Sequence, residues 1–286
     1  MIRMPRMPSS TGALAYFAAW LVPWRPVFRV RSPRSGLSLF VHRKDVIGRH
    51  VAKYGEHEPE LTRWIAARLA HAPPGLFVDV GANVGWHSLH AARQQNVQAV
   101  VAFEPDLFNA YLLDRNICEN AIDNVVVSTC AVGARAGTAR LYRYKTSNLG
   151  RHSMLEDYGR GFRTVPQLDL DAALRDLGFA DRRVSILKID VEGYEPDVIA
   201  GASGTLARTD AVILEFSPAL SRAGGSRPAT RWPGSMPRAS CPTRSTPADW
   251  SGRGSRNSKN SKVSATSSGS SPKAPLRAFV ATEVPR

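Results

Sequence analysis

The sequence predicts an α/β fold with a doubly wound, mostly parallel sheet. Short apolar runs alternate with helical stretches between residues 70 and 218. The runs are rich in Val, Ile, Leu and Phe and almost continuously apolar, as expected of parallel strands that are buried on both faces. A turn that contains Gly81 and Gly85 joins the first run to a helix, and this order places a ligand at the carboxyl ends of the strands.

The elements follow one another as strand and helix in turn. We expect strands at 76–80, 99–103, 125–130, 185–189 and 211–216, and helices at 86–95, 107–119, 170–177 and 196–207. Pro196 suits the first turn of the last helix, where no backbone N–H is needed. The longer connection after the third strand contains a short hairpin at 140–144. Upstream, the pattern indicates a strand at 37–43 and an amphipathic helix at 58–70.

Charge divides the chain into three parts. Residues 1–50 carry 9 Lys and Arg against 1 acidic residue, and residues 219–286 carry 12 against 2. Residues 51–218 carry 17 against 21. We therefore expect a basic N-terminal extension over 1–45 and a folded domain over 46–218. Because the basic charge lies outside the folded body, it does not indicate specific nucleic-acid binding.

The tail over 219–286 is dominated by Ser, Arg, Pro, Gly, Ala and Thr. Such a segment buries too little apolar area to offset the entropy of ordering, so we expect disorder. The abrupt change suggests a shift of reading frame near 219–225. The last strands of the sheet would then be missing, and the run at 211–216 would form an exposed apolar edge, with poor solubility.

The glycine turn decides which ligand the sheet holds. A dinucleotide fingerprint needs glycines at offsets 0, 2 and 5, but here those offsets carry Gly81, Asn83 and Trp86. A P-loop needs Lys and Ser or Thr after its last glycine, and Trp86 and His87 follow instead. Both phosphate-binding motifs are therefore disfavoured, and with them an NAD-linked oxidoreductase.

Acidic residues at two strand ends point to a different ligand. Asp79 precedes the turn, and a cationic group suits it better than a phosphate does. Asn83 can adopt a positive φ where a middle glycine would stand. Glu104 ends the next strand, where an acid binds the two ribose hydroxyls. S-adenosylmethionine combines a ribose with a positive centre and has no phosphate. In the structural alternative, the glycines only turn the chain and Asp79 caps the helix.

Several motifs occur in a characteristic order: FVDVGANVGWHSL, FEPD, NICENAIDNVVV, AVG, LKIDVEGYEPDVIAGA and VILEFSP. Together they resemble the FkbM-like family of S-adenosylmethionine-dependent methyltransferases, over roughly residues 46–218. The resemblance implies a class I methyltransferase fold, which is Rossmann-like. The sequence departs from the family pattern after residue 218, where a helix and two further strands normally follow.

The resemblance also implies roles for individual residues. The methionine end of the cofactor would be lined by Asp79, Gly81, Asn83 and Gly85, and the ribose would be bound by Glu104. The adenine would lie near Asn120, Ala131 and Val132. The transferred methyl group would face Asp190 and Glu192. Glu58 lies ahead of the first strand and reaches the cofactor by the same analogy, or simply starts a solvated helix.

The chemistry needs a group that positions the acceptor and takes the proton of a hydroxyl. Asp190 is the candidate, because it follows a buried strand directly. In the structural alternative, Asp190 or Glu192 pairs with Lys188 or caps the next helix. His87 and His90 have the spacing of metal ligands, but such a pair is usually structural, and we expect no metal.

The sequence thus predicts an O-methyltransferase that acts on a small molecule or a saccharide. The alternative is a catalytically impaired cofactor-binding protein, because the C-terminus is altered. The apolar run at 12–24 is shorter than the ~20 residues of a spanning helix, so we expect no transmembrane span and a cytoplasmic location. The sequence names neither the acceptor nor the oligomeric state.

Overall fold

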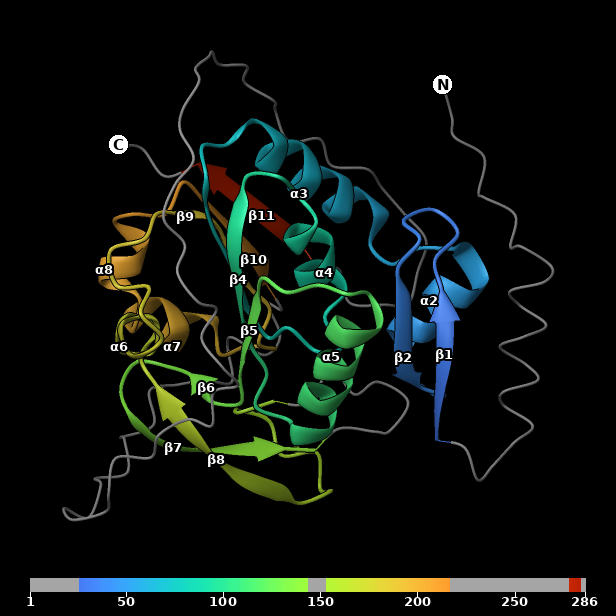
Figure 1. The fold of residues 1–286 in the computed structure, drawn as a ribbon. Coiled ribbons are helices and arrows are strands. Elements are labelled where there is room, and N and C mark those ends of the chain that lie inside the picture. Colours follow the sequence, from blue (N-terminus) through green and yellow to red (C-terminus); the bar gives the residue numbers. More distant parts are fainter. Residues whose placement is uncertain (1–25, 144–152, 217–277, 284–286) are drawn as a thin grey trace.

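The computed structural model describes residues 26–143, 153–216 and 278–283. A six-stranded sheet with the order β11-β10-β9-β3-β4-β5 forms the centre of the molecule (Figure 1). Its strands are β3 (Gly75–Val80), β4 (Val97–Phe103), β5 (Val125–Ser128), β9 (Val184–Ile189), β10 (Ala211–Phe216) and β11 (Ala278–Glu283). Five of them are parallel, and β11 is antiparallel to β10. The doubly wound α/β fold is therefore confirmed.

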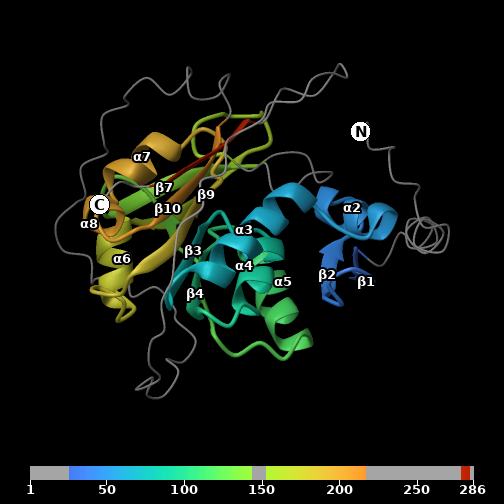
Figure 2. The same ribbon diagram turned by 90° about the horizontal axis from the view of Figure 1, so that it is seen from above.

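Helices cover both faces of the sheet, as the view from above shows (Figure 2). The helices are α2 (Val46–Tyr54), α3 (Pro59–His71), α4 (Trp86–Ala92), α5 (Leu107–Glu119), α6 (Leu170–Asp176), α7 (Glu195–Ala200) and α8 (Ser203–Leu206). On one face of the sheet, alternate strand residues form a hydrophobic cluster with α6 and α7. On the opposite face, the remaining strand residues form a second cluster with α3 and α4. All residues of β3 and β9 are buried, which explains their continuous apolar pattern.

Local sequence signals set the helix boundaries. Asp45, Asp106 and Asp169 cap α2, α5 and α6 by accepting hydrogen bonds from backbone N–H groups of the first turn. The helix expected over 196–207 is divided into α7 and α8. Gly201 lies between these two helices. A β-carbon at this position would lie 2.1 Å from the carbonyl oxygen of Gly133, so the two backbones approach too closely here for any side chain.

A hairpin of β1 (Val27–Arg31) and β2 (Ser38–His42) packs against α5. Its apolar residues share a core cluster with Trp86 and Leu112. The predicted boundary at residue 46 is therefore wrong for this segment, because residues 27–42 are integrated into the same core. Residues 1–25 lie outside the described residues, as does the apolar run at 12–24.

A second sheet has the order β6-β8-β7, with β6 (Ala131–Val132), β7 (Gly137–Tyr142) and β8 (Phe162–Leu168). The strand expected over 125–130 thus ends at 128, and the chain then enters this sheet. The hairpin expected at 140–144 is β7, which pairs with β8 across a long connection.

The edge of the main sheet differs from expectation. Strand β11 pairs with β10 at six successive positions, from Ala211 opposite Glu283 to Phe216 opposite Ala278. The predictions that no strand follows residue 218 and that β10 is an open edge are therefore wrong. The prediction of disorder is corrected for residues 278–283 only, which form β11. Residues 217–277 lie outside the described residues. The proposed shift of reading frame stays a prediction.

Candidate active site

Three charged side chains lie where β3 and β9 end. The Lys188 ammonium is 3.2 Å from Asp79 Oδ1 and 3.5 Å from Asp190 Oδ2. Ser88 Oγ donates a 2.6 Å hydrogen bond to the other oxygen of Asp79. Burial would lower the pKa of Lys188, but Asp79, Asp190, Glu215 and Glu58 together hold this pKa above its usual value. The lysine is therefore ionised among an excess of carboxylates.

The glycine turn owes its shape to close packing with the end of β9. Gly81 has φ +86°, and a β-carbon there would lie 1.9 Å from the carbonyl oxygen of Asp190. Gly85 has φ +89°, and a β-carbon there would meet the Leu113 side chain at 2.3 Å. Asn83 has φ +52°, so it occupies the left-handed region as expected. Gly81 thus keeps the turn against β9, whereas Gly85 lets the turn pack on α5.

Glu104 ends β4 and closes the turn from the other side. Its Oε2 accepts a 2.8 Å hydrogen bond from the Asn83 backbone N–H, and its Oε1 accepts one of 2.9 Å from the Asp106 N–H. Burial raises the pKa of Glu104 to about 8, although these backbone hydrogen bonds favour the ionised form. The structure therefore brings Asp79, Asn83, Glu104 and Asp190 together at one edge of the sheet.

The polar groups of the turn fit a cationic nucleoside. Asn83 Oδ1 is buried and has no hydrogen-bond partner among the described residues. A buried oxygen of this kind is costly unless a donor from a ligand reaches it. The surrounding carboxylates outnumber Lys188, so a ligand with positive charge is favoured over a phosphate.

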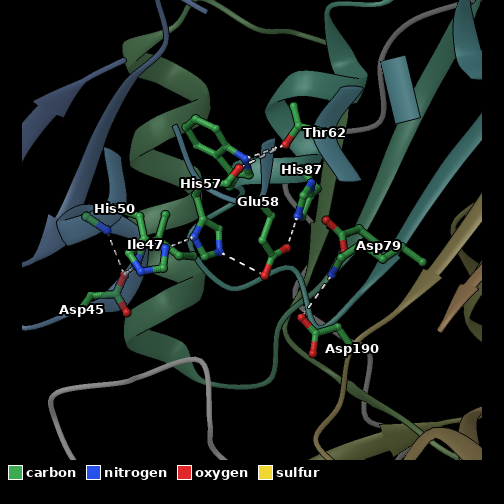
Figure 3. Close-up of polar contacts among 12 residues, drawn as sticks. Asp45, Ile47, His50, His57, Glu58, Thr62, Asp79, His87 and Asp190 are labelled. Atoms are coloured by element: carbon green, nitrogen blue, oxygen red, sulfur yellow. Dashed lines mark hydrogen bonds and ion pairs between the residues drawn. The ribbon is translucent and has the colours of Figure 1, made fainter. Parts of the chain in front are cut away.

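Glu58 joins the site from the segment between α2 and α3 (Figure 3). Its carboxylate lies 2.9 Å from His87 Nε2 and 3.4 Å from His57 Nε2, and His57 Nδ1 is 3.0 Å from His50 Nδ1. Burial alone would raise the pKa of Glu58, but the hydrogen bond from His87 and nearby charges lower it to about 2. Burial lowers the pKa of His57 to about 3, so this imidazole is neutral.

The backbone of Glu58 is also unusual. It has φ +41° and precedes α3 without capping that helix through its side chain. A non-glycine residue in this region is strained, and strain of this kind concentrates at functional sites. Glu58 is therefore not the solvated helix start that the sequence left open. His87 belongs to this cluster, whereas His90 stacks on Trp86, with ring centroids 4.5 Å apart. No metal-binding group of three ligands is found within the described residues.

Glu192 lies two residues beyond Asp190 and is 4% exposed, with φ +48°. Its carbonyl oxygen accepts a 3.2 Å hydrogen bond from Ser153 Oγ. Asp190 is more accessible, with 24% of its side chain exposed. The aspartate, more than the glutamate, is thus placed to meet an acceptor.

Two predicted cofactor residues lie elsewhere. Asn120 ends α5, and its side-chain amide hydrogen-bonds both the N–H (2.9 Å) and the carbonyl (2.7 Å) of Ser38 in the hairpin. Because the oxygen and the nitrogen of this amide both have partners in the protein, the role of Asn120 is structural. This corrects the adenine contact that the sequence predicted for it. The side chain of Ala131 packs with Leu141 and Val165, although its backbone follows the carboxyl end of β5.

The sequence predicted no functional role for Lys188, Ser88 or His57, whereas Ser153 lies in the segment 147–153, which the sequence left open as an acceptor contact or a flexible polar loop. The signal for Lys188 was present, because a lysine inside the buried run SILKI needs an acidic partner. The sequence carries no signal for Ser88 and His57, since neither belongs to the glycine turn or to a strand end.

The parallel order β10-β9-β3-β4-β5 with an antiparallel β11 is that of a Rossmann-like class I methyltransferase fold. The family model described as "Methyltransferase FkbM domain" matches residues 79–231, more than half of the chain. The chain therefore belongs to the FkbM methyltransferase family, and this prediction is confirmed. The match runs past residue 218, the end that the sequence predicted for the domain.

Individual relatives are more distant. Methyltransferase sdnD of Sordaria araneosa is 29% identical over 162 residues, which is 46% of this chain and 62% of the relative. Methyltransferase 1 of Beauveria bassiana strain ARSEF 2860 is 26% identical over 143 residues, or 44% and 57%. The chain thus spans less than two thirds of the length of these relatives. The crystal structure of methyltransferase FkbM from Methylobacillus flagellatus KT is 16% identical, covering 59% of this chain and 42% of that one with a TM-score of 0.34.

Proposed function

We propose that the protein transfers a methyl group from S-adenosylmethionine to a hydroxyl group of a small molecule or a saccharide. One observation carries the proposal: acidic side chains lie at the carboxyl ends of three adjacent parallel strands, at Glu104, Asp79 and Asp190, around a turn without a phosphate-binding motif. Membership of the FkbM family supports the same reaction.

The residues that would hold the cofactor divide by chemistry. Glu104 would accept hydrogen bonds from the ribose hydroxyls. Asp79 and the unpartnered Asn83 Oδ1 would face the positively charged methionine part. When bound, the cofactor supplies an electrophilic methyl group on its sulfonium. Gly81 would hold the turn against the end of β9 and so keep Asp79 and Asp190 on the same side of the site, because a side chain at position 81 would collide with the Asp190 carbonyl.

Asp190 would orient the acceptor and take the proton of its hydroxyl group. Its carboxylate is partly exposed, and the 3.5 Å contact with Lys188 leaves it able to accept another hydrogen bond. The Lys188 ammonium contacts both this carboxylate and that of Asp79, and it offsets the repulsion between them. Glu192 would shape the acceptor side through its backbone contact with Ser153.

Calorimetry with S-adenosylhomocysteine tests the cofactor assignment, and methyl transfer to a metabolite extract tests the reaction. We expect wild-type protein to bind the nucleoside and E104A to bind it at least about tenfold more weakly, since two hydrogen bonds to a buried carboxylate are lost. D190N should bind normally but lose methyl transfer. Normal binding by E104A would overturn the assignment of the ribose site.

The impaired-enzyme alternative predicts cofactor binding without transfer to any extract. Its reason was the altered C-terminus, which stays a prediction, and the pairing of β11 with β10 argues only against an open sheet edge. No helix of the described residues is long and apolar enough to cross a membrane. The cytoplasmic location stays a prediction.

A further inference from the structure

The second sheet meets the candidate active site at Ser153. Its Oγ donates the 3.2 Å hydrogen bond to the carbonyl of Glu192, two residues after Asp190. The backbone of Ser153 forms an antiparallel bridge with Tyr142, through N–O distances of 2.8 and 3.2 Å. This sheet is therefore tied to the side of the site where the acceptor would lie.

The bridge also fixes which face of the sheet looks toward the site. Residues directly opposite each other in an antiparallel pair project to the same side. Tyr142 is opposite both Ser153 and Phe162, and Arg140 is two residues before Tyr142 on the same strand. These four side chains share the face on which Ser153 reaches Glu192. The alternate residues of β7 and β8, such as Leu141 and Val165, enter a hydrophobic cluster on the other face.

We name this face, made of Arg140, Tyr142, Ser153 and Phe162, the β7–β8 face. Arg140 and Phe162 are the exposed members of this face, with Phe162 47% exposed, whereas Tyr142 and Ser153 are buried beneath them. Phe162 makes an edge contact with Tyr142, with ring centroids 5.8 Å apart. The Arg140 guanidinium lies 4.6 Å from the centroid of the Phe162 ring. Arg140 has no carboxylate partner within the described residues. The exposed Phe162 ring and the Arg140 guanidinium beside it together form a surface that suits a flat ligand with a negative charge.

We propose that the β7–β8 face binds the methyl acceptor, and that this acceptor carries a carboxylate or phosphate group. Arg140 recognises the anionic group, because the guanidinium fork pairs with such groups through two parallel hydrogen bonds. The flat part of the acceptor lies on Phe162. Phe162 is two strand spacings from Ser153, roughly 10 Å, so the anionic group and the reacting hydroxyl lie at opposite ends of the acceptor.

Charge separation gives the acceptor its direction. The strand ends carry Asp79 and Asp190, whose carboxylates repel an anionic group, whereas Arg140 attracts one. An acceptor charged at one end therefore enters with its neutral hydroxyl end toward Asp190. The inference rests on the proposed function, because the direction in which the acceptor enters matters for methyl transfer only when the cofactor is bound.

The test uses the full chain with S-adenosylhomocysteine and three probes, followed by ligand-observed NMR titration. The probes are a neutral glucose disaccharide, the same disaccharide with a terminal glucuronate, and 4-hydroxycinnamate. We expect at least one of the two anionic probes to bind about tenfold more tightly than the neutral one. Preference for the glucuronate indicates an acidic saccharide, and preference for the cinnamate indicates an aromatic acid.

Variants locate the binding. R140Q should weaken the preferred anionic probe about tenfold, and F162A should weaken it without removing the preference for negative charge. R175Q, at an exposed arginine of α6, is the matched control and should change nothing. Equal binding of neutral and anionic probes, or unchanged binding by R140Q, would overturn the inference. If wild-type protein fails to bind S-adenosylhomocysteine, the proposed function fails instead.

Discussion

Gly81 lies directly against the backbone carbonyl of Asp190, so that a β-carbon at position 81 would come within 1.9 Å of the carbonyl oxygen. This contact joins the turn after β3 to the end of β9, the two segments that carry Asp79 and Asp190. The hydrogen bond from the Asp190 N–H to the Val80 carbonyl, at 2.9 Å, reinforces it. The geometry of the site therefore depends on the absence of a side chain at position 81.

G81A should destabilise the protein by about 3 kcal/mol or more, because it adds a backbone clash to an unfavourable positive φ. G36A is the control: Gly36 has φ +74° but nothing within 4 Å of a β-carbon. It should cost only about 1 kcal/mol. Urea denaturation measures both values. Equal losses in the two variants would show that the contact with Asp190 is not restrictive.

Glu104 should make stability fall as pH rises. Its pKa in the folded protein is about 8, above the usual 4.5, so the folded state holds a proton that the unfolded state releases. The contribution is complete below about pH 4.5 and is lost as pH rises through 8, by up to about 1.4 kcal/mol per pH unit. E104Q should remove this slope. Parallel stability profiles of wild type and E104Q between pH 5 and 8 would contradict the assignment.

Lys188 should be essential to folding as long as Asp79 is charged. K188M leaves a buried carboxylate without its cation and should cost about 3–5 kcal/mol. The double variant D79N/K188M removes both charges, and we expect it to recover most of that loss. Denaturant midpoints of the two single variants and the double variant give the coupling energy. A double variant no more stable than K188M would show that the two side chains are not energetically paired.

Asn120 should matter for stability and not for the cofactor. N120A removes the partners of two backbone groups of Ser38 and should cost about 2 kcal/mol. The affinity for S-adenosylhomocysteine should stay within about twofold of wild type, because no other side chain of the site contacts this amide. A tenfold loss of affinity at unchanged stability would restore the adenine role that the sequence predicted.

The sequence predicted the main sheet well, because its parallel strands are nearly continuous apolar runs that alternate with helical stretches. Glycine offsets and strand-end acids likewise predicted Asp79, Asn83 and Glu104 as one group. The failures share a cause: they depend on contacts between distant segments. The pairing of β11 with β10 spans more than sixty residues, and nothing local to 278–283 announces it. The same holds for Asn120, whose partner Ser38 lies 82 positions away.

Asn116 shows what the family match leaves out. Its side-chain amide donates to the carbonyls of Phe40 in the hairpin and of Val84 in the glycine turn, at 3.2 and 2.8 Å. The matched region begins at residue 79, yet the glycine turn is braced by a hairpin some forty residues earlier. An expression fragment cut at the family boundary would lose that brace and most of β3. The part of the chain that shares one packed core is therefore larger than the region that the family model matches.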